Sequence, residues 1–277
     1  MFFGLKGNKT RQDSRRTRHV LVAATLILIS AAAMDTKAQT GSDPMRFLVW
    51  VRDDVQAIPS ALFQAPTNAA GLFVIAWGGV ALKDDEWATS MQSWHRRELW
   101  RLVEELGDAN AARPAALIIF VGSLLQDDAR YQDAAFTSIE ALVVANMATN
   151  ALKLIAGRSR PWQAEDSHNW EPFTGKTSFP SGHATTAFAL ITPWLVYLPH
   201  PVTWSLAGLA TATSMSRVTL RYHWPSDVVA GAVIGGTIGV WLARRHKRDS
   251  SSQFAESGRI NLSTILAPRT LGLRVRF

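Results

Sequence analysis

The chain contains no cysteine among its 277 residues. A disulfide framework and a cysteine-ligated metal site are therefore excluded, and the fold has to rest on the packing of its elements. The sequence also lacks an HExxH segment or any other closely spaced group of histidines, which argues against a zinc enzyme. With 47% hydrophobic residues, the chain is long enough to bury a core and is predicted to form one domain with appendages.

Positive charge is concentrated at the start of the chain. The formal net charge is +7, and the segment before residue 20 alone carries six basic residues against one acidic residue. The remainder is close to neutral, which argues against a nucleic-acid partner. An apolar run to Met34 and then small residues follow the basic segment, an order typical of an export signal. We therefore expect residues 1–38 to be a signal sequence or N-terminal anchor, and the body to lie in the periplasm or at the periplasmic face of a bacterial membrane.

Three short strings, far apart in the chain, carry residues suited to phosphate chemistry. They are KLIAGRSRP at residues 153–161, PSGH at residues 180–183 and SRVTLRYHWPSD at residues 216–227. Each string alone is a weak signal, because short motifs also match by chance. Their presence together and in this order, with the spacings K-x6-RP, PSGH and SR-x5-H-x3-D, predicts one composite site.

These strings supply the groups that phosphoryl transfer requires. Lys153, Arg160 and Arg217 are cations for the three equatorial oxygens, and the planar fork of an arginine suits bidentate binding. Ser181 is predicted to cap the helix that follows, and Gly182 lets the backbone approach an anion closely. The free N–H groups of that helix start, with the positive end of the helix dipole, then face the phosphate.

His223 is the predicted nucleophile. It precedes Asp227 by four residues, and Pro225 and Ser226 mark a turn that opens the last apolar helix. A carboxylate in this position holds the imidazole in the tautomer that leaves its other nitrogen free to attack phosphorus.

With these residues and spacings, the chain resembles the type 2 phosphatidic acid phosphatase (PAP2) family. Its superfamily also contains bacterial non-specific acid phosphatases and vanadium haloperoxidases. The resemblance covers roughly residues 113–248, and no motif position departs from the pattern. It implies that the phosphate is held by Lys153, Arg160, Ser181, Gly182 and Arg217.

The resemblance also implies the catalytic roles and the reaction. By elimination and by similarity to the family, His183 is the general acid that protonates the leaving oxygen, beside His223 and Asp227. The implied activity is that of a metal-independent acid phosphatase without a cofactor, which hydrolyses phosphomonoesters or pyrophosphates through a phosphohistidine. A phosphorylated lipid or a small phosphoester is the expected substrate, with the protein associated with a membrane. The sequence leaves the physiological substrate and the oligomeric state open.

Three other functions compete with this interpretation. A vanadate-dependent haloperoxidase would use the same cations, because vanadate mimics the phosphoryl transition state. A non-catalytic envelope protein that binds lipid headgroups would need cations, but neither an acid nor an oriented nucleophile. A zinc site made of His183, His223, Asp227 and His168 is opposed by the three cations, which repel a divalent ion.

Helices dominate the predicted fold. We expect an all-α bundle of about six core helices, at residues 69–82, 114–125, 136–156, 184–198, 202–215 and 227–244. Residues 39–66 are predicted to be a linker with a short helical piece, and residues 86–106 one amphipathic helix. The predicted domains are a helical extension at residues 39–112, the phosphatase core at residues 113–248 and a tail at residues 249–277.

The sequence supports either a body embedded in the membrane or an exported body outside it. Residues 184–216 contain no Asp, Glu, Lys or Arg, and the basic run at residues 244–248 is typical of a cytoplasmic flank. However, the apolar runs are shorter than the roughly 20 residues of a membrane span. In the tail, apolar residues alternate with Gly and Arg from Leu271 to Phe277. This alternation predicts a β-hairpin that packs on the body or pairs with a partner.

Overall fold

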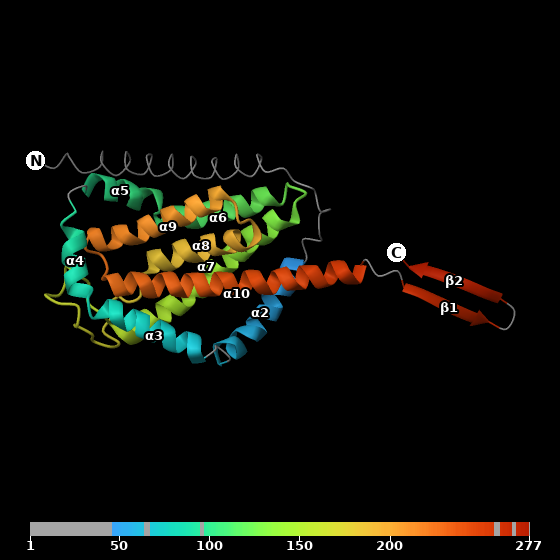
Figure 1. The fold of residues 1–277 in the computed structure, drawn as a ribbon, viewed down its shortest axis with the longest axis horizontal. Helices are drawn as coiled ribbons and strands as arrows, with labels where there is room; N and C mark the ends of the chain where they lie inside the picture. Colours follow the sequence, from blue (N-terminus) through green and yellow to red (C-terminus); the bar gives the residue numbers. More distant parts are fainter. Residues whose placement is uncertain (1–45, 64–66, 95–96, 258–260, 268–269, 277) are drawn as a thin grey trace, which may run out of the picture.

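The computed structural model describes residues 46–63, 67–94, 97–257, 261–267 and 270–276, so the expected export signal lies outside the described residues. The body is a bundle of α-helices, which confirms the predicted all-α class (Figure 1). The helices are α2 (Arg46–Phe63), α3 (Thr67–Ala81), α4 (Asp84–Gln92), α5 (Arg97–Leu106), α6 (Ala109–Ser123), α7 (Ala129–Ala156), α8 (Gly182–Tyr197), α9 (Pro201–Thr219) and α10 (Pro225–Ser257).

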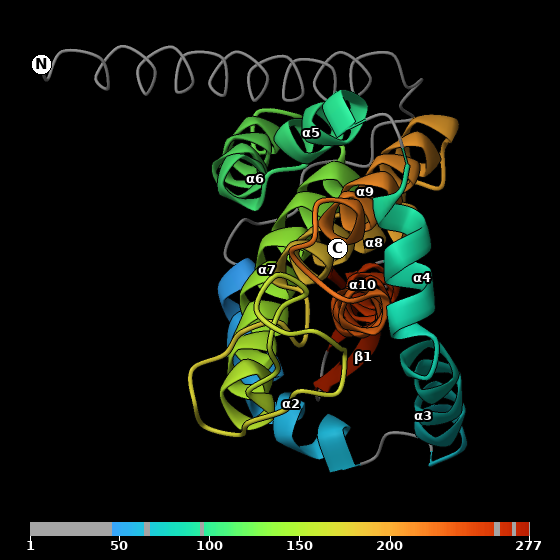
Figure 2. The same ribbon diagram turned by 90° about the vertical axis from the view of Figure 1, so that its left-hand side faces the viewer.

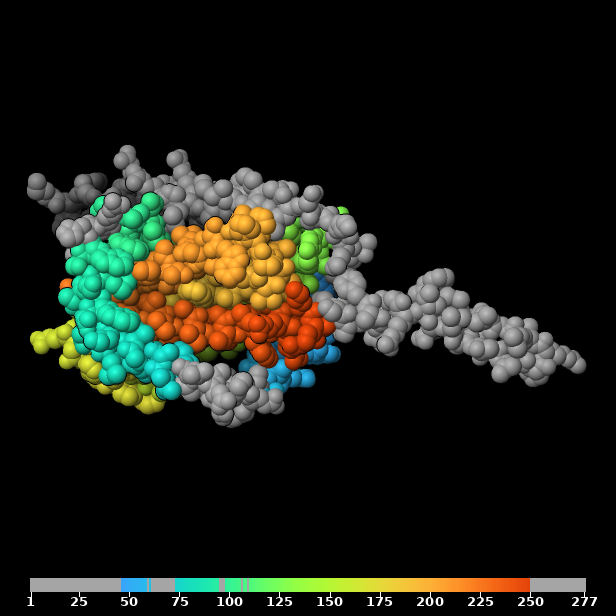
Figure 3. Space-filling view, in the orientation of Figure 1, coloured from blue at the N-terminus to red at the C-terminus, as the bar shows by residue number. Residues whose placement is uncertain are grey.

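The centre of the bundle is made by α7, α8 and α10, which pack against one another (Figure 2). Helix α9 lies on α8, α6 on α7 and α5 on α9, while α3 and α4 lie along α10. In the space-filling view, α3 and α4 form one end of the visible surface beside α9 and α10 (Figure 3). Small side chains fill one of the core clusters, where Ala141, Ala145 and Ala189 surround Leu242. Small residues at these positions let the helix axes approach closely.

Three glycines spaced by four residues bring α10 against α8. A Cβ atom on Gly231 would lie 2.3 Å from the carbonyl oxygen of Ser181, and one on Gly235 would lie 2.2 Å from that of Thr185. A Cβ on Gly239 would lie 2.0 Å from Thr192 Oγ1. The spacing therefore places the three glycines on one face of α10, where any larger side chain would collide with α8.

Residues 46–63 correct the prediction of a linker with a short helical piece. They form the 18-residue helix α2, in which Phe47 and Trp50 are buried. Its first residue, Arg46, forms a buried ion pair with Asp133 of α7 at 2.8 Å. The sequence of this segment is polar and contains a proline, so it does not predict a long helix. Contacts with the body therefore stabilise the helix.

The single amphipathic helix predicted at residues 86–106 is also corrected, because the structure divides it into α4 and α5. Helix α4 ends at a cap on Ser93, whose hydroxyl donates to the carbonyl oxygen of Ser90 at 2.6 Å. Helix α4 packs on α9 and α10, whereas α5 packs on α9. The break lets α4 reach α10 while both helices pack on α9.

Helices α7 and α10 extend beyond their predicted apolar runs, to 28 and 33 residues. Within the described residues, Ala129–Ala156 and Pro225–Asp249 are the two segments long and apolar enough to cross a bilayer, judged by length and composition. Several large apolar side chains of α7 face outward, including Val143, Met147 and Leu154.

Two short strands follow α10 at the C-terminal end. Strands β1 (Asn261–Ala267) and β2 (Thr270–Arg276) pair antiparallel, from Asn261 opposite Arg276 to Ala267 opposite Thr270.

We expect Gly235→Ala to destabilise the protein by about 1–3 kcal/mol, because the added methyl group meets the backbone of α8 rather than a mobile side chain. Gly236→Ala is the matched control, since a Cβ there finds its nearest neighbour, Thr192 Cγ2, at 3.8 Å. Thermal unfolding in detergent should show a lower Tm for Gly235→Ala and an unchanged or higher Tm for Gly236→Ala. Equal Tm values for the two variants would contradict the close approach of α8 and α10.

Candidate active site

The candidate site lies at one end of the bundle, where α7 and α9 end and α8 and α10 begin (Figure 2). Gly157 ends α7 in the left-handed conformation, with φ of 57°, and its N–H donates to the carbonyl oxygen of Lys153. A Cβ on Gly157 would lie 1.7 Å from the carbonyl oxygen of Glu171. Only glycine fits at this position. The chain turns at Gly157 after the helix end, and this turn places Arg160 on the same side as Lys153.

Lys153 and Arg160 converge on the segment that precedes α8. Lys153 Nζ donates to the carbonyl oxygens of Thr177 and Pro180, at 2.7 and 2.6 Å. Arg160 Nη2 donates to Thr177 Oγ1 at 3.3 Å. The two cations of the first predicted string therefore stand beside the second string, PSGH.

Ser181 occupies the predicted N-cap position of α8, but its side chain makes no capping hydrogen bond. Its hydroxyl oxygen is buried and has no hydrogen-bond partner among the described residues. Its N–H donates to the carbonyl oxygen of Asp227 at 2.9 Å, which connects the start of α8 to the start of α10. A Cβ on Gly182 would have only Lys153 Cε within 4 Å, at 3.9 Å. The start of α8 thus offers a free hydroxyl and an open approach for an anion.

His223 and Asp227 are both buried, and His223 Nδ1 lies 3.7 Å from Asp227 Oδ2. This distance is too long for a hydrogen bond. The Asp227 carboxylate accepts from Arg158 Nη1 at 2.6 Å, from Ser178 Oγ at 2.5 Å and from the N–H of Trp224 at 3.0 Å. The carboxylate expected to orient His223 is therefore itself held by three donors.

Two acidic residues that the motifs did not predict lie beside the remaining site residues. Glu104 of α5 pairs with Arg217 Nη1, and Asp108, the N-cap of α6, places Oδ1 3.8 Å from His183 Nε2. The guanidinium of Arg217 also lies 4.1 Å above the ring of Tyr222. The segment from α5 to α6 therefore brings negative charge to the cationic cluster.

Burial and the mutual repulsion of the site's cations set its protonation states. Burial, followed by Arg217 and His223, lowers the pKa of His183 to about 3. Burial lowers the pKa of His223 to about 4, although Asp227 opposes this change. Burial and Arg217 also lower the pKa of Arg160. Both imidazoles are therefore neutral above about pH 5. The pKa of each imidazole depends on the charges of the neighbouring site residues.

The structure thus brings all eight predicted site residues to the same helix ends, but it leaves His168 of the zinc alternative outside that group. The His168 side chain is 74% exposed and faces Asp85 at 3.9 Å. Among the described residues, one group of carboxylates and histidine has metal-ligand spacing, namely Asp54, Glu140 and His246. It lies between α2, α7 and α10 and contains none of the predicted site residues; Arg245 supplies it with positive charge at 2.5 Å from Asp54.

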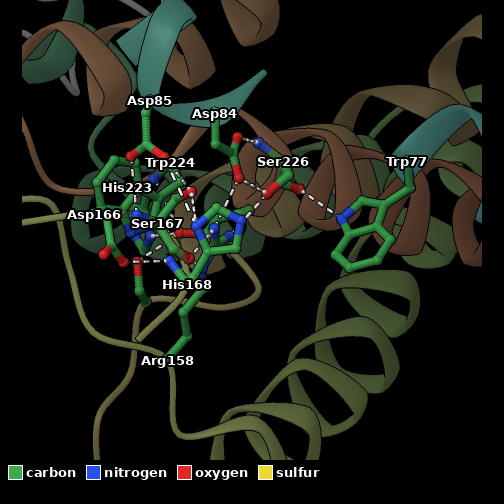
Figure 4. Close-up of polar contacts among 12 residues, drawn as sticks. Trp77, Asp84, Asp85, Arg158, Asp166, Ser167, His168, His223, Trp224 and Ser226 are labelled. Atoms are coloured by element: carbon green, nitrogen blue, oxygen red, sulfur yellow. Dashed lines mark hydrogen bonds and ion pairs between the residues drawn. The ribbon is translucent and has the colours of Figure 1, made fainter. Parts of the chain in front are cut away.

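Besides Glu104 and Asp108, sequence reasoning missed Arg158 and Asp84 at the site. Arg158 is buried and forms ion pairs with both Asp84 and Asp227. Figure 4 shows Arg158 and Asp84 within the polar network. A signal for Arg158 was present, since it lies in the first string two residues before Arg160. Asp84 stands in no motif, and the sequence contains no comparable sign of it.

Comparison with known proteins agrees with this geometry. Residues 134–250 match the family model described as the PAP2 superfamily, and they include every predicted catalytic and phosphate-binding residue. The resemblance predicted from the three strings is therefore confirmed over these residues. Asp84, Glu104 and Asp108 lie outside them.

Two curated relatives show what proteins this chain is similar to. The lipid A 1-phosphatase of Rhizobium etli is 36% identical over 115 residues, which are 39% of this chain and 47% of that protein. The undecaprenyl-diphosphatase BcrC of Bacillus subtilis is 31% identical over 111 residues, or 40% of this chain and 55% of that protein. The chain thus spans about half the length of these relatives.

A solved structure has a similar fold. It is the transmembrane PAP2 type phosphatidylglycerolphosphate phosphatase of Bacillus subtilis, with a TM-score of 0.52 and 19% identity. The match covers 66% of this chain and 96% of that one. At this identity the likeness establishes the helical fold alone.

We expect an oxyanion that binds between the cations to raise the pKa of His183 and so to take up a proton. The affinity for tungstate should then fall as pH rises between the low pKa of the free protein and the higher pKa of the complex. Titration calorimetry in buffers of different ionisation enthalpy counts the protons taken up. His183→Gln should lower that count by about one proton, whereas His168→Gln should not change it. The same count in His183→Gln and wild type would show that the proton goes elsewhere.

Proposed function

We propose that this protein is a phosphatase that hydrolyses lipid phosphomonoesters or pyrophosphates through a phosphohistidine, without a metal ion. The observation that carries the proposal is the gathering of three cations, a free helix start and two neutral imidazoles, that of His223 buried and that of His183 partly exposed, at one end of the bundle. Cations and backbone donors stabilise the charge of a phosphoryl group in transfer. The names of the phosphatase relatives support the same reaction class.

In the first step, the free nitrogen of neutral His223 attacks phosphorus and the bond to the leaving oxygen breaks. Asp227 stabilises the positive charge that forms on the ring. His183, protonated in the complex with the anionic substrate, gives its proton to the leaving oxygen. In the second step, neutral His183 takes a proton from water, which attacks phosphorus and releases inorganic phosphate and His223.

An apolar groove beside His183 supports a lipid substrate. The groove has a volume of about 200 Å³ and lies between α6, α7, α8 and α9. On α8 its lining begins at Thr186, one turn after His183, and continues to Leu198. Twelve residues of helix span about 18 Å, a length that suits an extended hydrocarbon chain. Gly107, next to Asp108, also lines the groove.

Membrane association is the second part of the proposal. Helices α7 and α10 are long and apolar enough to cross a bilayer, and Met147 of α7 is 68% exposed. A large outward apolar side chain on such a helix fits a lipid environment. We infer that the site faces the periplasm, because the basic and apolar start of the chain has the pattern of an export signal.

We expect His223→Ala to lower kcat by several orders of magnitude, because the covalent route loses its nucleophile. Alkaline denaturation during turnover of a radiolabelled substrate should trap a phosphohistidine in wild type and none in this variant. His183→Gln is the control, since it should still form the phosphoenzyme from p-nitrophenyl phosphate, whose leaving group needs little acid. Retention of more than about a tenth of the wild-type kcat in His223→Ala would refute the assignment. Turnover of bromide and peroxide with added vanadate would instead identify a haloperoxidase.

We expect Ala187→Phe to impair turnover of a long-chain lipid phosphate and to leave p-nitrophenyl phosphate turnover unchanged. Ala187 lines the groove, and a ring that displaces about two methylene groups removes roughly 1.6 kcal/mol of burial, or about a tenfold rise in KM. Thr211→Phe is the control, because Thr211 is exposed on α9 and lies outside the lining. Equal effects of Ala187→Phe on both substrates would exclude the groove as the site of the lipid chain.

A further inference from the structure

Asp84 is a fully buried carboxylate at the start of α4, outside the residues that match the PAP2 superfamily. Its Oδ1 accepts from the N–H of Ser226 at 2.8 Å, and its Oδ2 accepts from Arg158 Nη2 at 2.7 Å and from Ser226 Oγ. Figure 4 shows that Asp84 and Ser226 point toward each other, with Trp77 donating to the carbonyl oxygen of Ser226. Burial raises the pKa of Asp84, while Ser226 and Arg158 oppose the rise. These donors take the place of water around the carboxylate.

Arg158 connects Asp84 to Asp227, the carboxylate beside the proposed nucleophile His223. Its guanidinium is 2% exposed, and Nη1 donates to Ser226 Oγ at 2.8 Å and to Asp227 Oδ1 at 2.6 Å. Nε and Nη2 both donate to the carbonyl oxygen of Ser167, at 3.1 and 2.7 Å. Every nitrogen of the fork is therefore bonded, which fixes the orientation of the group.

This arrangement also sets the charge beside His223. Two buried carboxylates, those of Asp84 and Asp227, share one guanidinium, which leaves one net negative charge next to the imidazole. Phosphorylation of His223 places a positive charge on the ring, and the excess negative charge stabilises it. The other charged or titratable groups that act on His223 lie on α7, the loop before α8, α8 and α9, namely Lys153, Arg160, His183 and Arg217.

We propose that Asp84 is a positioning residue for the nucleophile: it holds Arg158 and Ser226, and through them the Asp227 carboxylate, in the orientation and charge state that His223 requires. The proposal rests on the proposed phosphatase function. It makes α4, which the family match leaves out, a part of the catalytic apparatus.

Two variants of Asp84 and one neighbour test this role. Asp84→Asn keeps the shape and the acceptor for Ser226 but removes the negative charge. Asp84→Glu keeps the charge and moves it by one methylene group. Glu86→Gln is the matched control, because Glu86 lies on the same helix, has a side chain that is 65% exposed, and pairs with Lys83 instead of a residue of this network.

The decisive measurement is the pKa of His223, followed by NMR of protein labelled with ¹⁵N in its histidine side chains, together with kcat and KM. Asp84→Asn should lower the pKa of His223 by about one unit, because one carboxylate instead of two then balances the positive charge of Arg158. It should lower kcat by roughly tenfold or more and change KM little. Glu86→Gln should leave both the pKa of His223 and kcat as in wild type.

A folded Asp84→Asn protein with wild-type kcat and an unshifted pKa of His223 would overturn the proposal, as would an equal pKa shift in Glu86→Gln. If Asp84→Asn does not fold, Asp84→Glu decides: a displaced fork should lower kcat while the pKa of His223 stays, and unchanged kcat would refute positioning. The NMR titration needs no turnover. A wild-type protein inactive on lipid and aryl phosphates would therefore refute the phosphatase function, while the comparison of pKa values still decides the role of Asp84.

Discussion

The two ion pairs of the buried Arg158 connect parts of the chain that the rest of the site depends on. One carboxylate comes from α4 and the other from the first turn of α10, and the arginine follows the end of α7. A guanidinium that is 2% exposed stays in a protein interior only when its donors are bonded and its charge is compensated. Removing either carboxylate takes away one of the two ion pairs of this guanidinium and leaves its donors on that side without a partner, so the segment before residue 134 and the PAP2 segment are energetically coupled at this point.

Part of the candidate site could be predicted from the sequence because it is carried by local spacing. Lys153 and Arg160 lie on the two sides of one helix end, and His223 and Asp227 lie on the two sides of one helix start. Such residues come together through the geometry of a single turn. The same local logic identified the cap at Ser181, although not that its hydroxyl makes no capping bond.

The remainder required tertiary structure. Asp84 meets Arg158 across 74 positions, and Glu104 meets Arg217 across 113, without any periodic pattern that marks either acid. The apolar groove is lined by residues of five helices, α5 to α9, so its existence depends on how they pack. The helix α2 and the break between α4 and α5 were likewise decided by burial against other elements, which overrides local propensity.

The hydrogen bond from Ser181 N–H to the Asp227 carbonyl has a mechanical meaning. It joins the start of α8, which would receive the anion, to the start of α10, which carries Asp227, the partner of the proposed nucleophile. Gly231 packs directly against the Ser181 carbonyl. The distance between the proposed nucleophile, His223, and an anion at the start of α8 therefore depends on main-chain geometry, which thermal motion of side chains alters little. Adaptation to new substrates can then proceed in α5 and α6 without disturbing the distance over which the bond to phosphorus forms.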